Sequence, residues 1–121
     1  FKAVGSDIDP QSIALAMENA KKAGVDGYIS VSLADVKDFA PTTERGVVIT
    51  NPPYGERLLD IKSAEALYKV LGSVFPSKKG YKYNVISSDD NFETCFGRPA
   101  DKRRKLYNGM IKCNLYSWFK E

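Results

Sequence analysis

The segment GVVITNPPYGER, residues 46–57, joins an apolar run to an unusual turn. Residues 46–50 have the character of a short strand that is buried on both faces at the centre of a parallel sheet. Two prolines follow Asn51, and because proline fixes φ and has no N–H, the chain leaves the strand as a stiff elbow that presents carbonyl acceptors. The Asn51 side chain and the Pro52 carbonyl can accept the two hydrogens of an –NH2 group, while Tyr54 stacks on a flat ring. The segment therefore predicts a pocket for a planar, amine-bearing ligand; the alternative is a turn that is only stiff.

Strand and helix patterns alternate along the rest of the chain. Asp9-Pro10 marks a helix start, because aspartate can cap free amide groups and proline at the first helical position loses no hydrogen bond. Asn108-Gly109 is a strong signal for a hairpin turn. The predicted order is strand 1–8, helix 10–23, strand 28–33, loop 36–45, strand 46–50, helix 61–75, strand 82–87, short helix 91–97 and hairpin 103–119. This order predicts an α/β fold, with a mainly parallel sheet covered by helices on both faces and a C-terminal antiparallel hairpin.

Polar residues follow three of the predicted strands. They are Asp7, Asp35 and Asn51. In open α/β sheets, ligands bind beyond the carboxyl ends of the strands. We therefore expect these three side chains to belong to one ligand site, although each of them alone is a weak signal.

Composition narrows the class of protein. The chain has 121 residues, of which 43% are apolar and 27% charged, as expected for one globular domain or part of one. No run approaches the ~18 apolar residues that span a membrane. The absence of histidine excludes Ser-His and Cys-His catalysis within the chain. Cys95 and Cys113 form neither a disulfide framework nor a metal-ligand spacing, so we expect free thiols, a reducing cytoplasm and no metal.

Four segments carry a resemblance to a known family. The run NPPYGERL at 51–58 contains the tetrapeptide of methyltransferases that act on exocyclic amines, and GSDIDP (5–10), MENAKKAG (17–24) and ALYKVLG (66–72) are more particular. Together they resemble the bacterial 23S ribosomal RNA guanine-N2 methyltransferases that carry an RNA-binding THUMP domain. Members are often labelled N6-adenine-specific DNA methylases. The resemblance covers nearly the whole chain and implies a Rossmann-like class I methyltransferase sheet.

The resemblance implies a role for each matching residue, with S-adenosylmethionine as cofactor. Asp7 would bind the ribose hydroxyls, Ile8 would flank the adenine, and Asp35 would accept from the adenine amino group. The alternatives are a helix cap for Asp7 and an ordinary strand-end turn for Asp35. The target guanine would be held by the tetrapeptide Asn51, Pro52, Pro53 and Tyr54, and the first of these also borders the cofactor.

A basic run suggests a polyanionic partner. Lys102, Arg103, Arg104 and Lys105 follow one another, and the net charge of the chain is +3. These four residues and Arg57 are candidate contacts to the phosphates of ribosomal RNA. The alternatives are a solvated strand end for the basic run and a salt bridge for Arg57. Tyr68, Trp118 and Phe119 are predicted to lie in the core.

The chain departs from the family pattern at its start, which is Phe1. It contains no G-x-G, so the glycine-rich loop and the central strand that precede the ribose-binding acid are missing. We therefore expect residues 1–121 to be the C-terminal part of a single methyltransferase catalytic domain and to bind S-adenosylmethionine weakly alone. The missing strand leaves two unpaired edges, which could close on each other, pair in a homodimer or accept further chain.

Two other functional classes stay open. A DNA adenine or protein glutamine methyltransferase would carry the same tetrapeptide, and a non-catalytic binding module could retain half of a cofactor site. The basic run mildly favours nucleic acid over protein but does not separate RNA from DNA.

Overall fold

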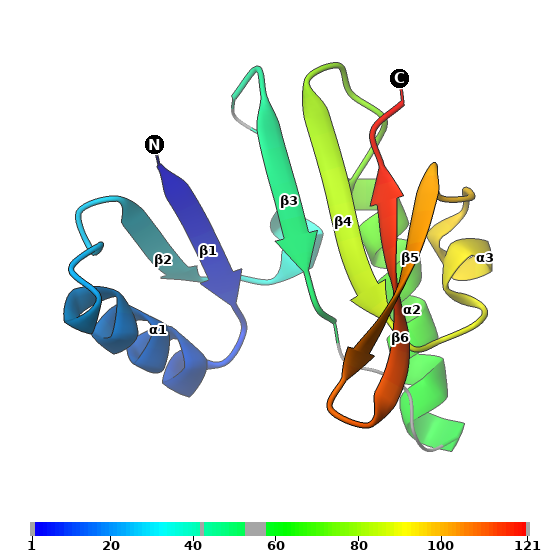
Figure 1. The fold of residues 1–121 in the computed structure, drawn as a ribbon, viewed down its shortest axis with the longest axis horizontal. Helices are drawn as coiled ribbons and strands as arrows, with labels where there is room; N and C mark the ends of the chain where they lie inside the picture. Colours follow the sequence, from blue (N-terminus) through cyan, green and yellow to red (C-terminus); the bar gives the residue numbers. More distant parts are fainter. Residues whose placement is uncertain (1, 42, 53–57, 121) are drawn as a thin grey trace. The chain divides into compact units, whose positions relative to one another are not determined.

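The structure is a computed structural model that describes residues 2–41, 43–52 and 58–120, without the side chains of 58–60. The element order agrees with the predicted one, with an additional short 3-10 helix (Figure 1). The elements are β1 (Ala3–Asp7), α1 (Pro10–Lys22), β2 (Ile29–Leu33), η1 (Val36–Asp38), β3 (Gly46–Thr50), α2 (Leu58–Val74), β4 (Tyr81–Ser87), α3 (Phe92–Phe96), β5 (Lys102–Asn108) and β6 (Ile111–Trp118).

The chain divides into an N-terminal unit, Phe1–Phe39, and a C-terminal unit, Ala40–Glu121. In the N-terminal unit β1 pairs with β2 in parallel, from Ala3 opposite Ile29 to Asp7 opposite Leu33. Helix α1 makes the crossover. It begins as predicted, because Asp9 Oδ1 accepts the Gln11 N–H at 3.0 Å and Pro10 occupies the first helical position.

The C-terminal unit contains a four-stranded sheet in the order β3-β4-β6-β5. Strands β3 and β4 are parallel, and the β4–β6 and β5–β6 pairs are antiparallel. Among the described residues, β1 pairs only with β2 and β3 only with β4, so the strands form two separate sheets, one in each unit. The missing strand that the sequence predicts between residues 2–7 and 47–50 stays a prediction.

Helices α2 and α3 cover one face of the C-terminal sheet with an aromatic core. Phe75, which directly follows α2, stacks on Tyr83 at 5.0 Å between ring centroids, and Phe96 of α3 stacks on Trp118 at 4.1 Å. Such pairs add about 0.5–1.5 kcal/mol each beyond the burial of their area. Tyr68 and Trp118 are core residues as predicted, but Phe119 is not, since it lies beyond the end of β6 and is 42% exposed.

Helices α2 and α3 approach each other at Gly72. A Cβ at this position would lie 1.9 Å from the Phe96 carbonyl oxygen, so only glycine allows the two helices to pack this closely. The small residue on α2 therefore fixes where α3 rests on the sheet.

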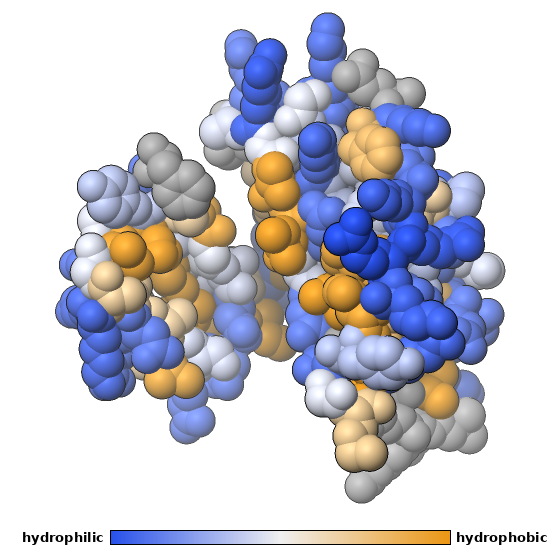
Figure 2. Space-filling model, viewed as in Figure 1, coloured by the Kyte–Doolittle hydropathy of each residue, from blue (hydrophilic) through white to orange (hydrophobic). Residues whose placement is uncertain are grey.

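The prediction that residues 46–50 are buried on both faces is wrong for the structure as described. Val47 and Ile49 are 66% and 72% exposed. They lie on the face that also carries Lys82 and Asn84, whereas α2 and α3 pack against the opposite face. No described element of the C-terminal unit covers Val47 and Ile49, and Figure 2 shows the apolar surface over β3.

The hairpin turn is also displaced from its predicted centre. Asn108 pairs with Ile111, so the two turn residues are Gly109 and Met110 rather than Asn108 and Gly109. Gly109 has a φ of +65°, and Met110 does not have a positive φ. A glycine with positive φ at the first turn position only is the pattern of a type II′ turn, which suits a hairpin as well as the Asn-Gly type I′ turn.

Candidate active site

The two predicted cofactor acids lie at the carboxyl edge of the N-terminal sheet. Asp7 ends β1, and its carbonyl accepts the Ala34 N–H at 3.0 Å, which brings the end of β2 and then Asp35 to the same edge. Asp7 Oδ1 accepts the Asp9 N–H at 2.9 Å. Asp35 Oδ1 accepts the Lys37 N–H at 3.0 Å and caps η1. Each acid therefore has a local structural role, and neither role excludes ligand binding.

These residues have the chemistry that the ribose and adenine of S-adenosylmethionine require. In both Asp7 and Asp35, one carboxylate oxygen accepts a backbone N–H nearby in the chain. The other oxygen has no hydrogen-bond partner among the described residues. A carboxylate at the end of a β-strand can accept from two ribose hydroxyls, as in dinucleotide folds. Ile8, which follows Asp7, is 69% exposed and offers an apolar surface for a flat ring. The residues present fit this half of the cofactor.

The predicted target-base residues begin at the carboxyl edge of the C-terminal sheet. Thr50 pairs with Val85, so Asn51 and Pro52 continue beside the end of β4. Asn51 is exposed and Pro52 is buried, which fixes the start of the elbow against the sheet. Pro53, Tyr54 and Arg57 lie outside the described residues, so their predicted roles stay predictions.

The end of β4 contributes a polar network beside this elbow. Ser87 is fully buried; its Oγ donates to Tyr68 Oη at 3.3 Å and accepts the Asp89 N–H at 3.1 Å. Tyr116 Oη donates to the Asp89 carbonyl at 3.4 Å, and Asp89 Oδ1 accepts the Asn91 N–H at 2.8 Å. The network fixes the start of the loop that follows β4, the strand that pairs with β3.

Sequence reasoning missed this network. Its one available signal was a fourth polar strand end, Ser88-Asp89-Asp90, after the predicted strand 82–87. Burial raises the pKa of Tyr68, so its hydroxyl stays protonated at neutral pH and serves as a hydrogen-bonding group. Tyr68 is thus a core residue whose polar end supports the rim of the candidate site.

The four residues of the basic run are all exposed on β5. Arg103 differs from its neighbours because its Nε lies 2.7 Å from Glu93 Oε1 of α3. This ion pair gives Arg103 a structural partner, while Lys102, Arg104 and Lys105 form no ion pair among the described residues. Arg103 is therefore a weaker candidate for a phosphate contact than Lys102, Arg104 and Lys105.

Two negative findings concern the described residues. They include no group of three or more histidine, cysteine or acidic side chains that could hold a metal ion. They also include no helix with the length and apolar character of a membrane span.

The model of one protein family matches residues 1–117, and its description is "RMKL-like, methyltransferase domain". The chain belongs to this family. It is 42% identical over 114 residues to "Putative RNA methyltransferase YpsC" of Bacillus subtilis and 42% identical over 120 residues to "Ribosomal RNA large subunit methyltransferase K/L" of Shewanella amazonensis. These matches cover 94% and 97% of the chain but only 30% and 17% of the two relatives, respectively.

A solved structure supports the same family and fold. SMU.472, complexed with SAH, is 39% identical and superposes with a TM-score of 0.92 over 98% of this chain and 32% of that one. The predicted α/β fold of the methyltransferase class is therefore confirmed. The RMKL-like match also agrees with the ribosomal RNA methyltransferase resemblance of the NPPYGERL segment.

Proposed function

We propose that this chain is part of an S-adenosylmethionine-dependent methyltransferase that modifies an exocyclic nucleobase amine, with guanine N2 of 23S ribosomal RNA as the target. The observation that carries the proposal is the Asn51-Pro52 elbow at the carboxyl end of β3 in a chain of the RMKL-like methyltransferase family. Relatives named as RNA and ribosomal RNA methyltransferases support RNA as the substrate. Residues 1–121 then form the C-terminal part of the catalytic domain.

Cofactor binding is assigned to the carboxyl edge of β1 and β2. Asp7 accepts from the ribose hydroxyls, Asp35 accepts from the adenine amine, and Ile8 covers one face of the ring. The support is the second carboxylate oxygen of each acid and the exposure of Ile8. The bound cofactor supplies an electrophilic methyl group, and the SAH complex of SMU.472 is consistent with this choice.

The elbow activates the amine by geometry rather than by a conventional base. The lone pair of a guanine amine is delocalised into the ring, so the nitrogen is a weak nucleophile. Asn51 Oδ1 and the Pro52 carbonyl accept its two hydrogens, favour a pyramidal nitrogen and direct the lone pair toward the methyl donor. Orienting two reactants in this way is worth about 7–11 kcal/mol. The surplus amine proton leaves to solvent.

The remaining residues hold the substrate. Pro53 keeps the elbow stiff, Tyr54 stacks on the guanine, and the base is unpaired or flipped out because the amine cannot otherwise reach the elbow. Lys102, Arg104 and Lys105 contact phosphates, as does Arg57. Arg103 would have to exchange its Glu93 partner to do so. The two free cysteines are consistent with a reducing cytoplasm.

The test is methyl transfer by the full protein from radiolabelled S-adenosylmethionine to unmethylated ribosomal RNA, DNA and release-factor peptides. We expect label only in RNA, as N2-methylguanosine after digestion. Asn51→Ala should abolish transfer and leave cofactor affinity within about twofold, whereas Asn51→Asp, which keeps a side-chain oxygen acceptor at this position, should retain part of the activity. Label in adenine of DNA or in a peptide would assign the chain to the alternative classes, and loss of cofactor binding in Asn51→Ala would contradict the role of Asn51.

A further inference from the structure

Positive charge is concentrated on the β5–β6 hairpin. Residues 102–118 contain five lysines and arginines and no acid, whereas the chain as a whole has 18 basic and 15 acidic residues. The rest of the chain, with 13 basic and 15 acidic residues, therefore has a net charge of −2. The basic character noted in the sequence is a property of this hairpin alone, and it does not end at Lys105, because Lys112 lies on the returning strand.

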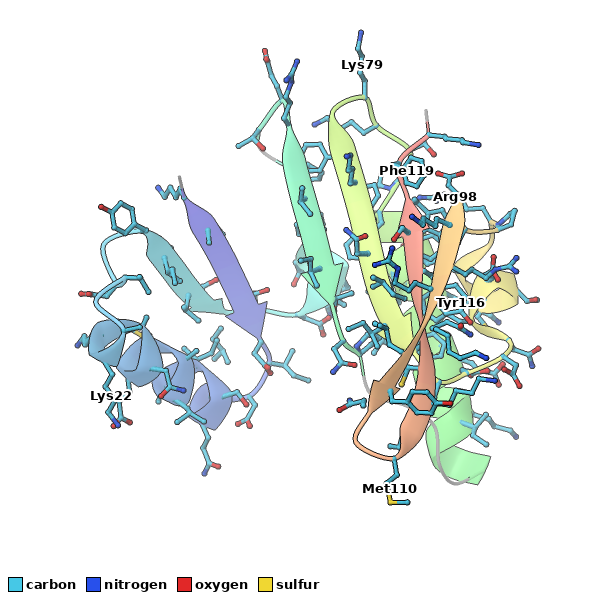
Figure 3. All side chains as sticks on the ribbon, viewed as in Figure 1. Lys22, Lys79, Arg98, Met110, Tyr116 and Phe119 are labelled. Carbon is cyan, nitrogen blue, oxygen red and sulfur yellow. The ribbon has the colours of Figure 1, made fainter. Side chains whose placement is uncertain are left out.

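The tip of the hairpin projects past the carboxyl edge of the C-terminal sheet. The last β4–β6 pair is Ser87 with Asn114, so residues 111–113 of β6 and their partners on β5 extend beyond β4. Three residues of strand span about 10 Å. Strand β3 is parallel to β4 and ends at the same edge, and Asn51 directly follows its last residue. Figure 3 shows Met110 at the far end of the hairpin, beyond the end of β4.

The tip exposes an aromatic ring between two lysines. Tyr107 is 67% exposed and lies directly opposite Lys112, and Lys105 is on the same face two residues along β5. Met110 at the turn is fully exposed. The contrast with Tyr116 is informative, because that residue of the same hairpin is 3% exposed and stacks on Phe92. The hairpin thus buries Tyr116 and Trp118 against α3 and presents Tyr107 near its tip.

We propose that this tip is a binding arm for single-stranded RNA beside the target nucleotide. Tyr107 stacks on a base that neighbours the target, and Lys105 and Lys112 contact the flanking phosphates. An exposed ring between cations, with no acid on either strand, suits a nucleic-acid strand, since every base offers a π-face and every phosphate a negative charge. The faces of bases inside a duplex are covered by neighbouring bases, whereas an unpaired base exposes its face to the ring, which favours a single strand over a duplex. The proposal rests on the proposed function for the choice of RNA.

The experiment compares Tyr107→Ala with Tyr107→Phe in the full protein. Affinity is measured by fluorescence anisotropy for a labelled single-stranded RNA, for its duplex and for single-stranded DNA of the same sequence. Loss of one stacked base weakens binding about 5- to 150-fold, so we expect this range for Tyr107→Ala. Tyr107→Phe keeps the ring and should stay within about twofold. The slope of log affinity against log salt is negative, and Lys112→Gln should make it less steep by about 0.7, because one phosphate contact is lost. Tyr107→Ala should leave the slope unchanged.

Several outcomes would overturn the binding arm. These are native affinity in Tyr107→Ala, equal losses in Tyr107→Ala and Tyr107→Phe, an unchanged salt slope in Lys112→Gln, and a preference for duplex RNA or for DNA. Thermal melting by circular dichroism checks that each variant is folded, and the lysine variant tests the arm independently of the ring. These are binding measurements made without cofactor. Methyl transfer is recorded in parallel. Loss of RNA affinity in Tyr107→Ala without methyl transfer by the native protein would contradict the proposed function alone, and methyl transfer with unchanged RNA affinity in Tyr107→Ala would contradict the binding arm alone.

Discussion

Of the described residues, the N-terminal unit buries one apolar side chain, Ala20, and the C-terminal unit buries twelve. Both units contain strands and an amphipathic helix, but in the first Val4, Leu15 and Leu33 are 75%, 58% and 59% exposed. A hollow of about 470 Å³ lies between α1 and the β1–β2 sheet, lined in part by Gly5 and Ala20. A two-stranded sheet alone is only marginally stable, and the helix that packs on this one adds Ala20 as its one buried apolar side chain among the described residues.

The candidate cofactor acids and the candidate target-base elbow belong to different units, and the two units differ in their physical properties. The acids proposed for the cofactor stand on a unit with little core of its own. The elbow proposed for the target base stands on a sheet fixed by stacked aromatic rings. We therefore expect the C-terminal unit to determine global stability and the N-terminal unit to open more readily.

The largest effect should come from removing the centre of the aromatic core. Phe92 is fully buried and lies near Tyr68, Tyr116 and Trp118. Phe92→Ala should lower the free energy of unfolding by about 3–5 kcal/mol. Leu15→Ala, on the exposed side of α1, should change it by less than about 0.5 kcal/mol. Urea denaturation measures both, and equal effects would contradict the difference between the units.

Two glycines, one in each unit, test the same difference in packing between the units. Gly72→Ala places a Cβ 1.9 Å from the Phe96 carbonyl oxygen, so α3 must move, and we expect a loss of about 1–3 kcal/mol despite the better helix propensity of alanine. Gly5→Ala in β1 meets no atom within 4 Å and should be neutral or slightly stabilising. Thermal melting of the two variants gives the answer, and a Gly72→Ala protein as stable as the native one would show that the α2–α3 contact is not rigid.

The polar network at the end of β4 should have a smaller effect. Tyr68→Phe removes the acceptor of the Ser87 hydroxyl and should cost about 1 kcal/mol. Tyr28→Phe in the N-terminal unit, where the side chain is 58% exposed, is the matched control and should be near neutral. Chemical denaturation resolves the difference. Faster amide exchange at Asp89 in Tyr68→Phe alone would further indicate that the network holds the loop.

The smallest expected effect is on a reaction rate rather than on stability. Burial, followed by the hydrogen bond to Glu65, raises the pKa of Cys95 to about 11. Because the folded pKa is the higher one, the folded state favours the protonated thiol, and stability falls as pH rises from the unfolded pKa, 9.0, toward 11. Iodoacetamide at pH 8 should label Cys95 at least tenfold more slowly in the folded protein than in urea. Equal rates would contradict the protection of the Cys95 thiol by the fold.

Local signals in the sequence were sufficient for the elements and for the residues that end them. Asp9 and Pro10 begin α1 as predicted, because capping and a fixed φ act over two or three residues. The order of strands and helices placed Asp7 and Asp35 at one sheet edge and Asn51 at the end of β3. The Asn-Gly signal gave the hairpin but not its centre, since a type II′ turn accepts Gly109 one position earlier in the turn.

By itself, the sequence determined the α/β order, the family and the polar strand ends, because each depends on residues that are close along the chain. Only the tertiary structure decided that Val47 and Ile49 are exposed and that Tyr107 lies outside the core. The same holds for two side-chain contacts, the hydrogen bond of Ser87 to Tyr68 and the ion pair of Arg103 with Glu93. These properties depend on which distant segment covers which face. Hydrophobic periodicity shows that a side chain can be buried, but it does not show whether another element is present to cover it.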